Sequence, residues 1–174
     1  METEIEIYLP DNMISGIITC LPKQRLLDRL NNISVGSLQS EEDFLVVRKA
    51  ESPEGEDHNI DSGLFYIRKT SILFIKETKQ NRNLINQEQN NRDIYIHQDR
   101  LPVRMKCRIP GYILTGNIYF NKNRELGEPI RKEREFLPMT EVSIDYLPDK
   151  IKSAAEFIAL NKNQILYMED SNHN

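Results

Sequence analysis

The sequence predicts an all-β protein with minor helix, built as two tandem small five-stranded antiparallel barrels related by internal duplication. Three observations predict this fold. Residues 101–121 alternate apolar and polar side chains, as two antiparallel strands do. Residues 1–21 repeat the same pattern, and similar strand pairs end both halves of the chain. Matching landmarks in the same order indicate a repeated unit.

The clearer copy of the hairpin lies in residues 101–121. Its first strand is expected to turn four side chains toward the core: Val103, Met105, Cys107 and Ile109. The basic side chains between them, on the opposite face, are Arg104, Lys106 and Arg108. Pro110 and Gly111 then interrupt the alternation, as turn residues do, and the chain returns as a second strand.

A shift of 100 residues reproduces this pattern in the first half. Ile5 and Ile7 take the places of Met105 and Cys107. Both returning strands carry a glycine at mid-strand, and these are the equivalent residues Gly16 and Gly116. Such a glycine predicts a bend or a close backbone approach, which a small barrel needs in order to close.

The ends of the two halves also correspond, at an offset of 93 residues. Residues 65–77 align with residues 158–170, and Phe44-Leu45 aligns with Phe136-Leu137. The alternative is that two β-rich halves resemble each other only because strands do. The matched prolines and glycines favour duplication, since strand periodicity does not require them.

The remaining elements are predicted in chain order. In the first half they are a short helix over 22–32, a strand over 44–48, an acidic loop over 51–62, and strands over 64–68 and 71–76. In the second half they are a strand over 93–98, a helix equivalent over 127–135, a strand over 136–144, a helical turn over 147–156, and strands over 157–160 and 164–168. The predicted domains are residues 1–77 and 93–170, joined by a polar Asn- and Gln-rich linker over 78–92.

The order of these elements resembles that of Sm-like barrels in two respects. A strand-turn-strand with a mid-strand glycine comes first, and a strand-bend-strand such as residues 66–75 comes last. The resemblance implies two small barrels. Sm-like proteins place their helix before the first strand, whereas here it follows the second, so the resemblance is not extended to RNA binding. The layout is also similar to a family of small bacterial barrels that brings no known activity with it.

Composition narrows the range of functions. The net charge of −4 makes the chain a poor general binder of phosphate backbones. Cys20 and Cys107 fall on predicted inner faces and are interpreted as core residues in a reducing compartment. The sequence contains no leader segment and no apolar run long enough to span a membrane, so a cytoplasmic protein is expected.

The sequence carries no catalytic signature and no Cys/His spacing typical of a metal site. We therefore expect no enzyme activity, no cofactor and no metal. The expected function is a non-catalytic interaction or scaffolding module, with a protein partner or self-association. The alternative is a nucleic-acid-binding small barrel.

The alternative depends on the basic row formed by Arg104, Lys106 and Arg108. This row is a candidate anion or nucleic-acid face. The favoured interpretation is a solvated strand face whose charge discourages edge association. A third interpretation pairs Arg104 and Lys106 with the equivalent residues Glu4 and Glu6 across a pseudo-twofold axis.

The last strands of the two halves, around residues 72–75 and 165–168, do not alternate. Because both of their faces are apolar, both faces should be covered. One cover is the core of the same half, and the other is the second half, a second chain or a long loop. The candidate interface residues are Ile72, Phe74, Ile165 and Tyr167.

Overall fold

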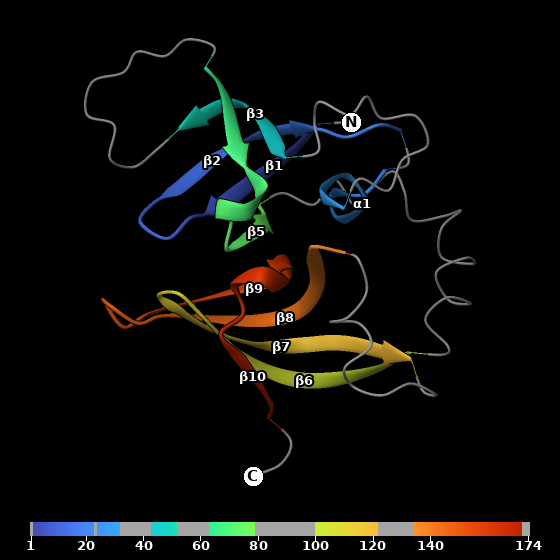
Figure 1. The fold of residues 1–174 in the computed structure, drawn as a ribbon, viewed down its shortest axis with the longest axis vertical. Helices are drawn as coiled ribbons and strands as arrows, with labels where there is room; N and C mark the ends of the chain where they lie inside the picture. Colours follow the sequence, from blue (N-terminus) through green and yellow to red (C-terminus); the bar gives the residue numbers. More distant parts are fainter. Residues whose placement is uncertain are drawn as a thin grey trace.

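In the computed structural model, described residues 2–22, 24–31, 43–51, 63–78, 100–121 and 134–171 form a single antiparallel sheet of ten strands (Figure 1). The first-half strands are β1 (Glu2–Tyr8), β2 (Met13–Thr19), β3 (Phe44–Glu51), β4 (Leu64–Arg68) and β5 (Phe74–Glu77). The second-half strands are β6 (Arg100–Ile109), β7 (Tyr112–Asn121), β8 (Phe136–Tyr146), β9 (Ile151–Asn161) and β10 (Tyr167–Asp170). Three short helical segments accompany them: α1 (Leu26–Leu30), η2 (Lys69–Ser71) and η4 (Lys162–Gln164).

The strand order across the sheet is β10-β6-β7-β8-β9-β5-β1-β2-β3-β4. Each half therefore contributes five neighbouring strands in the same order, with its own last strand first. The all-β prediction is confirmed, but the prediction of two closed barrels is wrong. Closure would need β5 to pair with β4, and β10 with β9. Instead β5 pairs with β9 of the other half, so the two halves continue one open sheet.

The hairpins of the two halves share the same register. Ile5 lies opposite Gly16 in one, and Met105 lies opposite Gly116 in the other. At each glycine position the pairing to the third strand shifts by a β-bulge. The bulges place Lys49 and Glu141, which are equivalent positions, in the left-handed region with φ of 48° and 52°. The bend that the mid-strand glycines predict is therefore a bulge on the neighbouring strand.

Those glycines are needed for a close backbone approach. A Cβ on Gly116 would lie 2.7 Å from the Thr140 carbonyl oxygen and 3.2 Å from the Cα of Val142. A Cβ on Gly16 would meet the side chain of Val47 and the backbone of the β3 bulge. Glycine is the residue that lets the second strand of each hairpin run this close to the third.

The backbone turns that precede the last strands also repeat. The amide of Leu73 donates to the Tyr8 carbonyl at 2.8 Å, and the amide of Leu166 donates to the Arg108 carbonyl at 2.9 Å. Leu73 and Leu166 are equivalent at the offset of 93, and Tyr8 and Arg108 at the offset of 100. The 3₁₀ turns η2 and η4 thus deliver β5 and β10 onto their hairpins in the same way.

One predicted helical element is a strand in the structure. The helical turn predicted over 147–156 is wrong, because the chain turns at Leu147–Lys150 and returns as the long strand β9. Lys150 adopts φ of 55° at this turn, and β9 then pairs with β8 from Ile151 onward. Pairing with a neighbouring strand overrides the helix propensity of the Ser-Ala-Ala-Glu stretch.

The predicted helix over 22–32 is confirmed at its centre, as α1, and two of its leucines, Leu26 and Leu30, are buried. Other predicted elements lie outside the described residues: the strand over 93–98, nearly all of the linker, most of the acidic loop, and most of the helix equivalent over 127–135.

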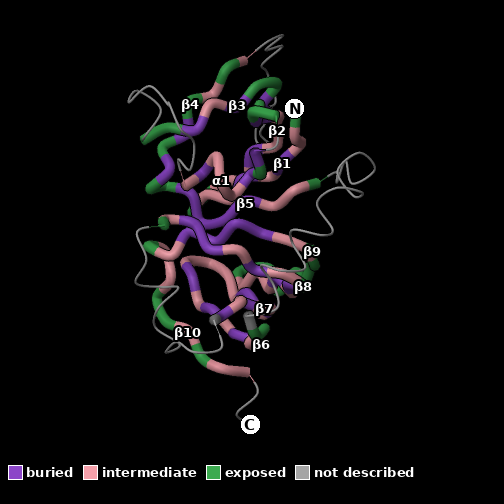
Figure 2. Tube along the Cα trace, turned by 90° about the vertical axis from the view of Figure 1, so that its right-hand side faces the viewer, coloured by how far each residue is buried: buried purple, intermediate pink, exposed green. Residues whose placement is uncertain are grey.

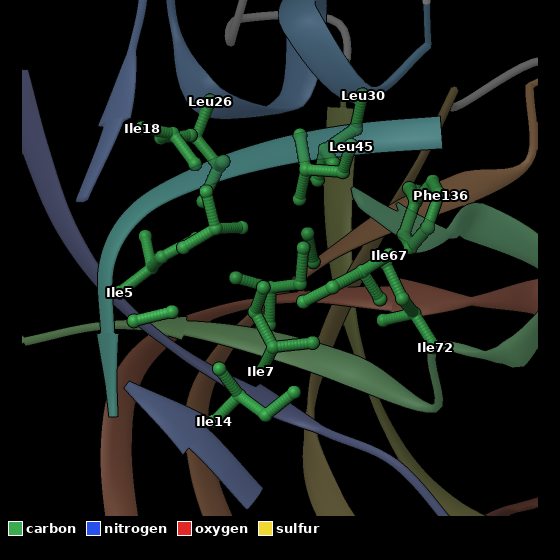
Figure 3. Packing of buried hydrophobic residues seen from close by; sticks show 14 of the residues in the cluster. Ile5, Ile7, Ile14, Ile18, Leu26, Leu30, Leu45, Ile67, Ile72 and Phe136 are labelled. Atoms are coloured by element: carbon green, nitrogen blue, oxygen red, sulfur yellow. The ribbon is translucent and has the colours of Figure 1, made fainter. Parts of the chain in front are cut away.

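Buried side chains form two cores that exchange residues between the halves. The first core consists of Ile5, Ile7, Ile14, Ile18, Cys20, Leu26, Leu30, Leu45, Val47, Ala50, Ile67, Ile72, Ile75, Phe136 and Ala159. The second core consists of Leu73, Phe74, Met105, Cys107, Ile109, Leu114, Ile118, Phe120, Met139, Val142, Ile144, Ile158 and Leu160. Figure 3 shows Phe136 of the second half beside Leu45 and Ile72 of the first core. Conversely, Leu73 and Phe74 of the first half pack in the second core.

Candidate functional site

The two halves meet at the joint, which we define as the antiparallel pairing of β5 with β9. Phe74 lies opposite Leu160, Ile75 opposite Ala159 and Lys76 opposite Ile158. Phe74, Ile75, Ala159 and Leu160 are fully buried. Figure 2 shows the longest run of buried chain where β5 and β9 run side by side. The joint is thus a strand-edge pairing with an apolar cover on both faces of the sheet.

Asn161 forms three hydrogen bonds to the first half at one end of the joint. Its amide nitrogen donates to the backbone carbonyls of Ile72 at 2.9 Å and Lys69 at 3.2 Å, and its own N–H donates to the Leu73 carbonyl at 3.0 Å. Nearby, the side-chain amide of Gln164 donates to the Thr70 carbonyl at 2.7 Å. The carbonyls of the η2 turn are therefore satisfied by side chains of the other half, as buried polar groups must be.

Aromatic rings pack around Phe74, which lies at the same end of the joint as Asn161. Phe74 stacks on Tyr8 with centroids 4.2 Å apart and meets Tyr112 edge-on at 5.4 Å. Burial, together with the charge of Glu6, raises the pKa of Tyr8, and burial together with Tyr146 raises the pKa of Tyr112. The Tyr8 hydroxyl donates to a Glu6 carboxylate oxygen at 2.9 Å, so this phenol remains a neutral hydrogen-bond donor.

The structure places the candidate interface residues in different environments. Ile72 and Phe74 are fully buried, Ile72 in the first core and Phe74 in the second. Ile165 is half-buried against the second core, and Tyr167 is 56% exposed. β5, the last strand of the first half, is therefore covered on both faces. β10, the equivalent strand of the second half, leaves Tyr167 exposed.

No match to this chain was found among protein-family models, curated proteins or solved structures. The candidate binding surfaces of this chain lie at the two ends of the sheet. We call β4 and β10 the free edges, because each has a neighbouring strand on only one side among the described strands.

The free edges carry exposed apolar side chains. Leu166 and Tyr167 at the β10 edge are 64% and 56% exposed. Tyr66 and Leu64 on β4 are 65% and 52% exposed, and Phe44 beside β4 is also exposed. The equivalents of Leu166, Tyr167, Tyr66 and Phe44 at the joint are all fully buried, and they are Leu73, Phe74, Ala159 and Phe136. The equivalent of Leu64, which is Phe157, is half-buried. Most of the residues exposed at the free edges are therefore equivalent to residues that are buried at the joint.

Sequence reasoning missed Leu64, Tyr66 and Leu166 as candidate surface residues. Leu166 belongs to the apolar run that was recognised, but which copy of the run is covered depends on strand order. The sequence did offer one signal. The apolar run occurs twice, at residues 72–75 and 165–168, but a single chain can use only one of these runs to join its two halves.

The basic row lies on β6, next to β10. Lys106 is bound by Glu169 of β10, with its ammonium nitrogen 2.8 Å from a carboxylate oxygen, and this contact raises the pKa of Lys106. Arg104 and Arg108 are half-buried on the same strand. Nucleic-acid binding by this row stays a prediction. The middle residue of the row, Lys106, already forms an ion pair with Glu169.

The pairing of the basic row with Glu4 and Glu6 across the two halves is wrong. Glu6 binds Lys76 of its own half at 3.0 Å, just as Lys106 binds Glu169 of its own half. Strands β1 and β6 are not neighbours in the sheet. Glu6 is equivalent to Lys106 and Lys76 to Glu169, so the same ion pair occurs in both halves with its charges exchanged.

Within the described part of the chain, no cluster of His, Cys, Asp and Glu has the geometry to hold a metal ion. The helices placed in these ranges are all too short or too polar to cross a bilayer. Cys20 and Cys107 are thiols that form no disulfide, and they are buried in the two cores. Burial raises the pKa of both thiols, and that of Cys107 reaches about 12.

We expect both thiols to be unreactive in the folded protein. At neutral pH the thiolate of Cys107 is negligible, and the nucleophile is the thiolate. A disulfide-type thiol reagent should label neither cysteine in buffer and both in denaturant. Unfolded thiols release protons near the ordinary pKa of 9.0 while folded Cys107 retains its proton, so stability should fall as the pH rises from there toward about 12. Rapid labelling of the native protein would contradict this placement.

Proposed function

We propose that this protein is a non-catalytic interaction or scaffolding module that binds protein partners by strand addition at its two free edges. One observation carries the proposal: both free edges combine an open strand with exposed Leu or Tyr side chains. Strand addition derives affinity from main-chain hydrogen bonds and specificity from side chains along the edge. Natural proteins commonly blunt free edges with charge or proline. These edges carry charged residues, but they also expose large apolar side chains beside them.

The joint supports this proposal, because it displays the same mode of contact inside the chain. There, three residue pairs of β5 and β9 are joined edge to edge with apolar side chains on both faces. The duplicated architecture proposed for the two halves accounts for this likeness: each half has one edge that it uses in the joint and one that it presents outward.

Affinity capture with edge variants tests the proposal. Tyr66→Glu changes the β4 edge and Leu166→Glu the β10 edge, and Leu21→Glu is the matched control, since Leu21 is 56% exposed but lies outside the strands. We expect proteins from the native cell extract that are retained by the wild-type chain and by Leu21→Glu to be lost with one or both edge variants. An identical set of proteins captured by all four chains would refute edge binding.

A further inference from the structure

We propose that the partner of each free edge is a second copy of this chain, with β4 of one copy pairing antiparallel with β10 of the next. This inference rests on the proposed function and specifies its occupant. It follows from the strand order: the joint pairs the fourth strand of the second half with the fifth strand of the first half. The two strands left over, β4 and β10, are the fourth strand of the first half and the fifth of the second.

The equivalences fix the register of the proposed contact. In the joint, Ile75 lies opposite Ala159. A shift of 93 residues converts Ile75 to Met168 and, in reverse, Ala159 to Tyr66. Met168 of one copy should therefore lie opposite Tyr66 of the next, which is a favourable pairing of a thioether with an aromatic ring.

The side chains that the joint buries have apolar or donor counterparts at the free edges. Leu166 and Tyr167 stand where Leu73 and Phe74 stand in the joint, and Phe44 stands where Phe136 inserts into the first core. Arg68 occupies the place of Asn161, which donates to two carbonyls of the η2 turn. A guanidinium supplies donors only, so it suits the equivalent carbonyls of the η4 turn in the next copy.

Charge disfavours pairing between two β10 edges, because β10 carries Glu169 and Asp170 and an antiparallel pair of such edges would bring carboxylates close together. In the mixed register, Glu169 instead lies opposite the apolar Phe65. The mixed pairing is head-to-tail, so each added copy leaves one β4 and one β10 open, and the assembly closes as a ring or continues as a filament.

Complementation between two edge variants tests the direction of assembly. Wild-type chain should grow in mass with concentration in sedimentation or light-scattering measurements, while Tyr66→Glu alone and Leu166→Glu alone should remain monomeric. Mixed together, the variants retain one intact β4 edge and one intact β10 edge between them, so they should form a dimer containing one of each. The Leu21→Glu control should assemble as wild type does.

Each other outcome overturns the inference. Self-association of Leu166→Glu but not Tyr66→Glu would indicate β4–β4 pairing, and the reverse would indicate β10–β10 pairing. A wild-type chain that stays monomeric at every accessible concentration, while its edges still capture other proteins, refutes self-pairing and leaves the proposed function standing. Monomeric behaviour together with capture that no edge variant reduces would remove both.

Disulfide trapping tests the register without depending on affinity. Tyr66→Cys and Met168→Cys chains, mixed and oxidised, should give a cross-linked dimer of one chain of each kind. Opposed strand residues have Cα separations within the range that a disulfide spans. Tyr66→Cys mixed with Leu21→Cys is the matched control and should remain uncrosslinked. Equal cross-linking of both mixtures would show random collision and would contradict the register.

Discussion

Replacing Phe74 by alanine is expected to destabilise the protein by about 3–5 kcal/mol, the usual cost of deleting a buried phenylalanine ring. The ring is fully buried, stacks on Tyr8 and meets Tyr112 edge-on. It belongs to the first half by sequence but packs in the second core. Its loss should therefore weaken the attachment between the halves as well as one core.

Equilibrium urea unfolding at low protein concentration measures this effect. Tyr167→Ala is the matched control, because Tyr167 is the equivalent aromatic residue of the second half and is largely exposed. The control should change the free energy of unfolding by about 0.5 kcal/mol or less, as surface substitutions do. Equal effects of the two substitutions would mean that the joint does not bury Phe74 as the structure has it.

Gly116→Ala is expected to cost about 3 kcal/mol, at the upper end of what overpacking does. The added Cβ would lie 2.7 Å from the Thr140 carbonyl oxygen and 3.0 Å from a methyl of Val142. The carbonyl belongs to the backbone beside the β8 bulge, which cannot move without breaking its pairing to β7. The thermal midpoint should fall accordingly, as calorimetry would measure.

Two companion variants separate the causes. Val142→Ala in the Gly116→Ala background removes the methyl contact but leaves the carbonyl contact, so it should not restore stability. Gly111→Ala is the contrasting case, because a Cβ there would only make an ordinary contact with the Tyr146 ring at 3.7 Å. Its cost should come from the φ of 76° alone and amount to about 1–2 kcal/mol. Full rescue by Val142→Ala would place the strain in side chains rather than in the backbone.

Much of the local fold could be predicted from the sequence. Alternation placed both hairpins, and Gly16 and Gly116 marked the two bulges, because side-chain period and steric demands act over a few residues. Strand closure could not be predicted in this way. Alternation indicates which face of a strand is buried, but it does not indicate which edge meets which, and so β5 was not assigned to β9.

The candidate interface was predictable only in part, for a related reason. Residues 72–75 and 165–168 are similarly apolar, and nothing in them states which is used inside the chain. The order of the strands in the sheet determines which run is buried. β5 pairs with β9 at the joint, whereas β10 lies at the end of the sheet. Ile72 and Phe74 are therefore buried while Tyr167 is exposed.

The exchanged ion pairs have a consequence for folding. A chain with two look-alike halves risks misassembly, in which β5 docks on β6 and β10 docks on β1. That exchange would set Lys76 against Lys106 and Glu169 against Glu6, and like charges opposite each other in a sheet are destabilising. The native arrangement neutralises all four charges. The double variant Glu6→Lys with Lys76→Glu keeps an ion pair between β1 and β5 but gives both halves the same charge order. It should therefore misassemble more often and refold with a lower yield than the wild type. An equal refolding yield would argue against this role of the ion pairs.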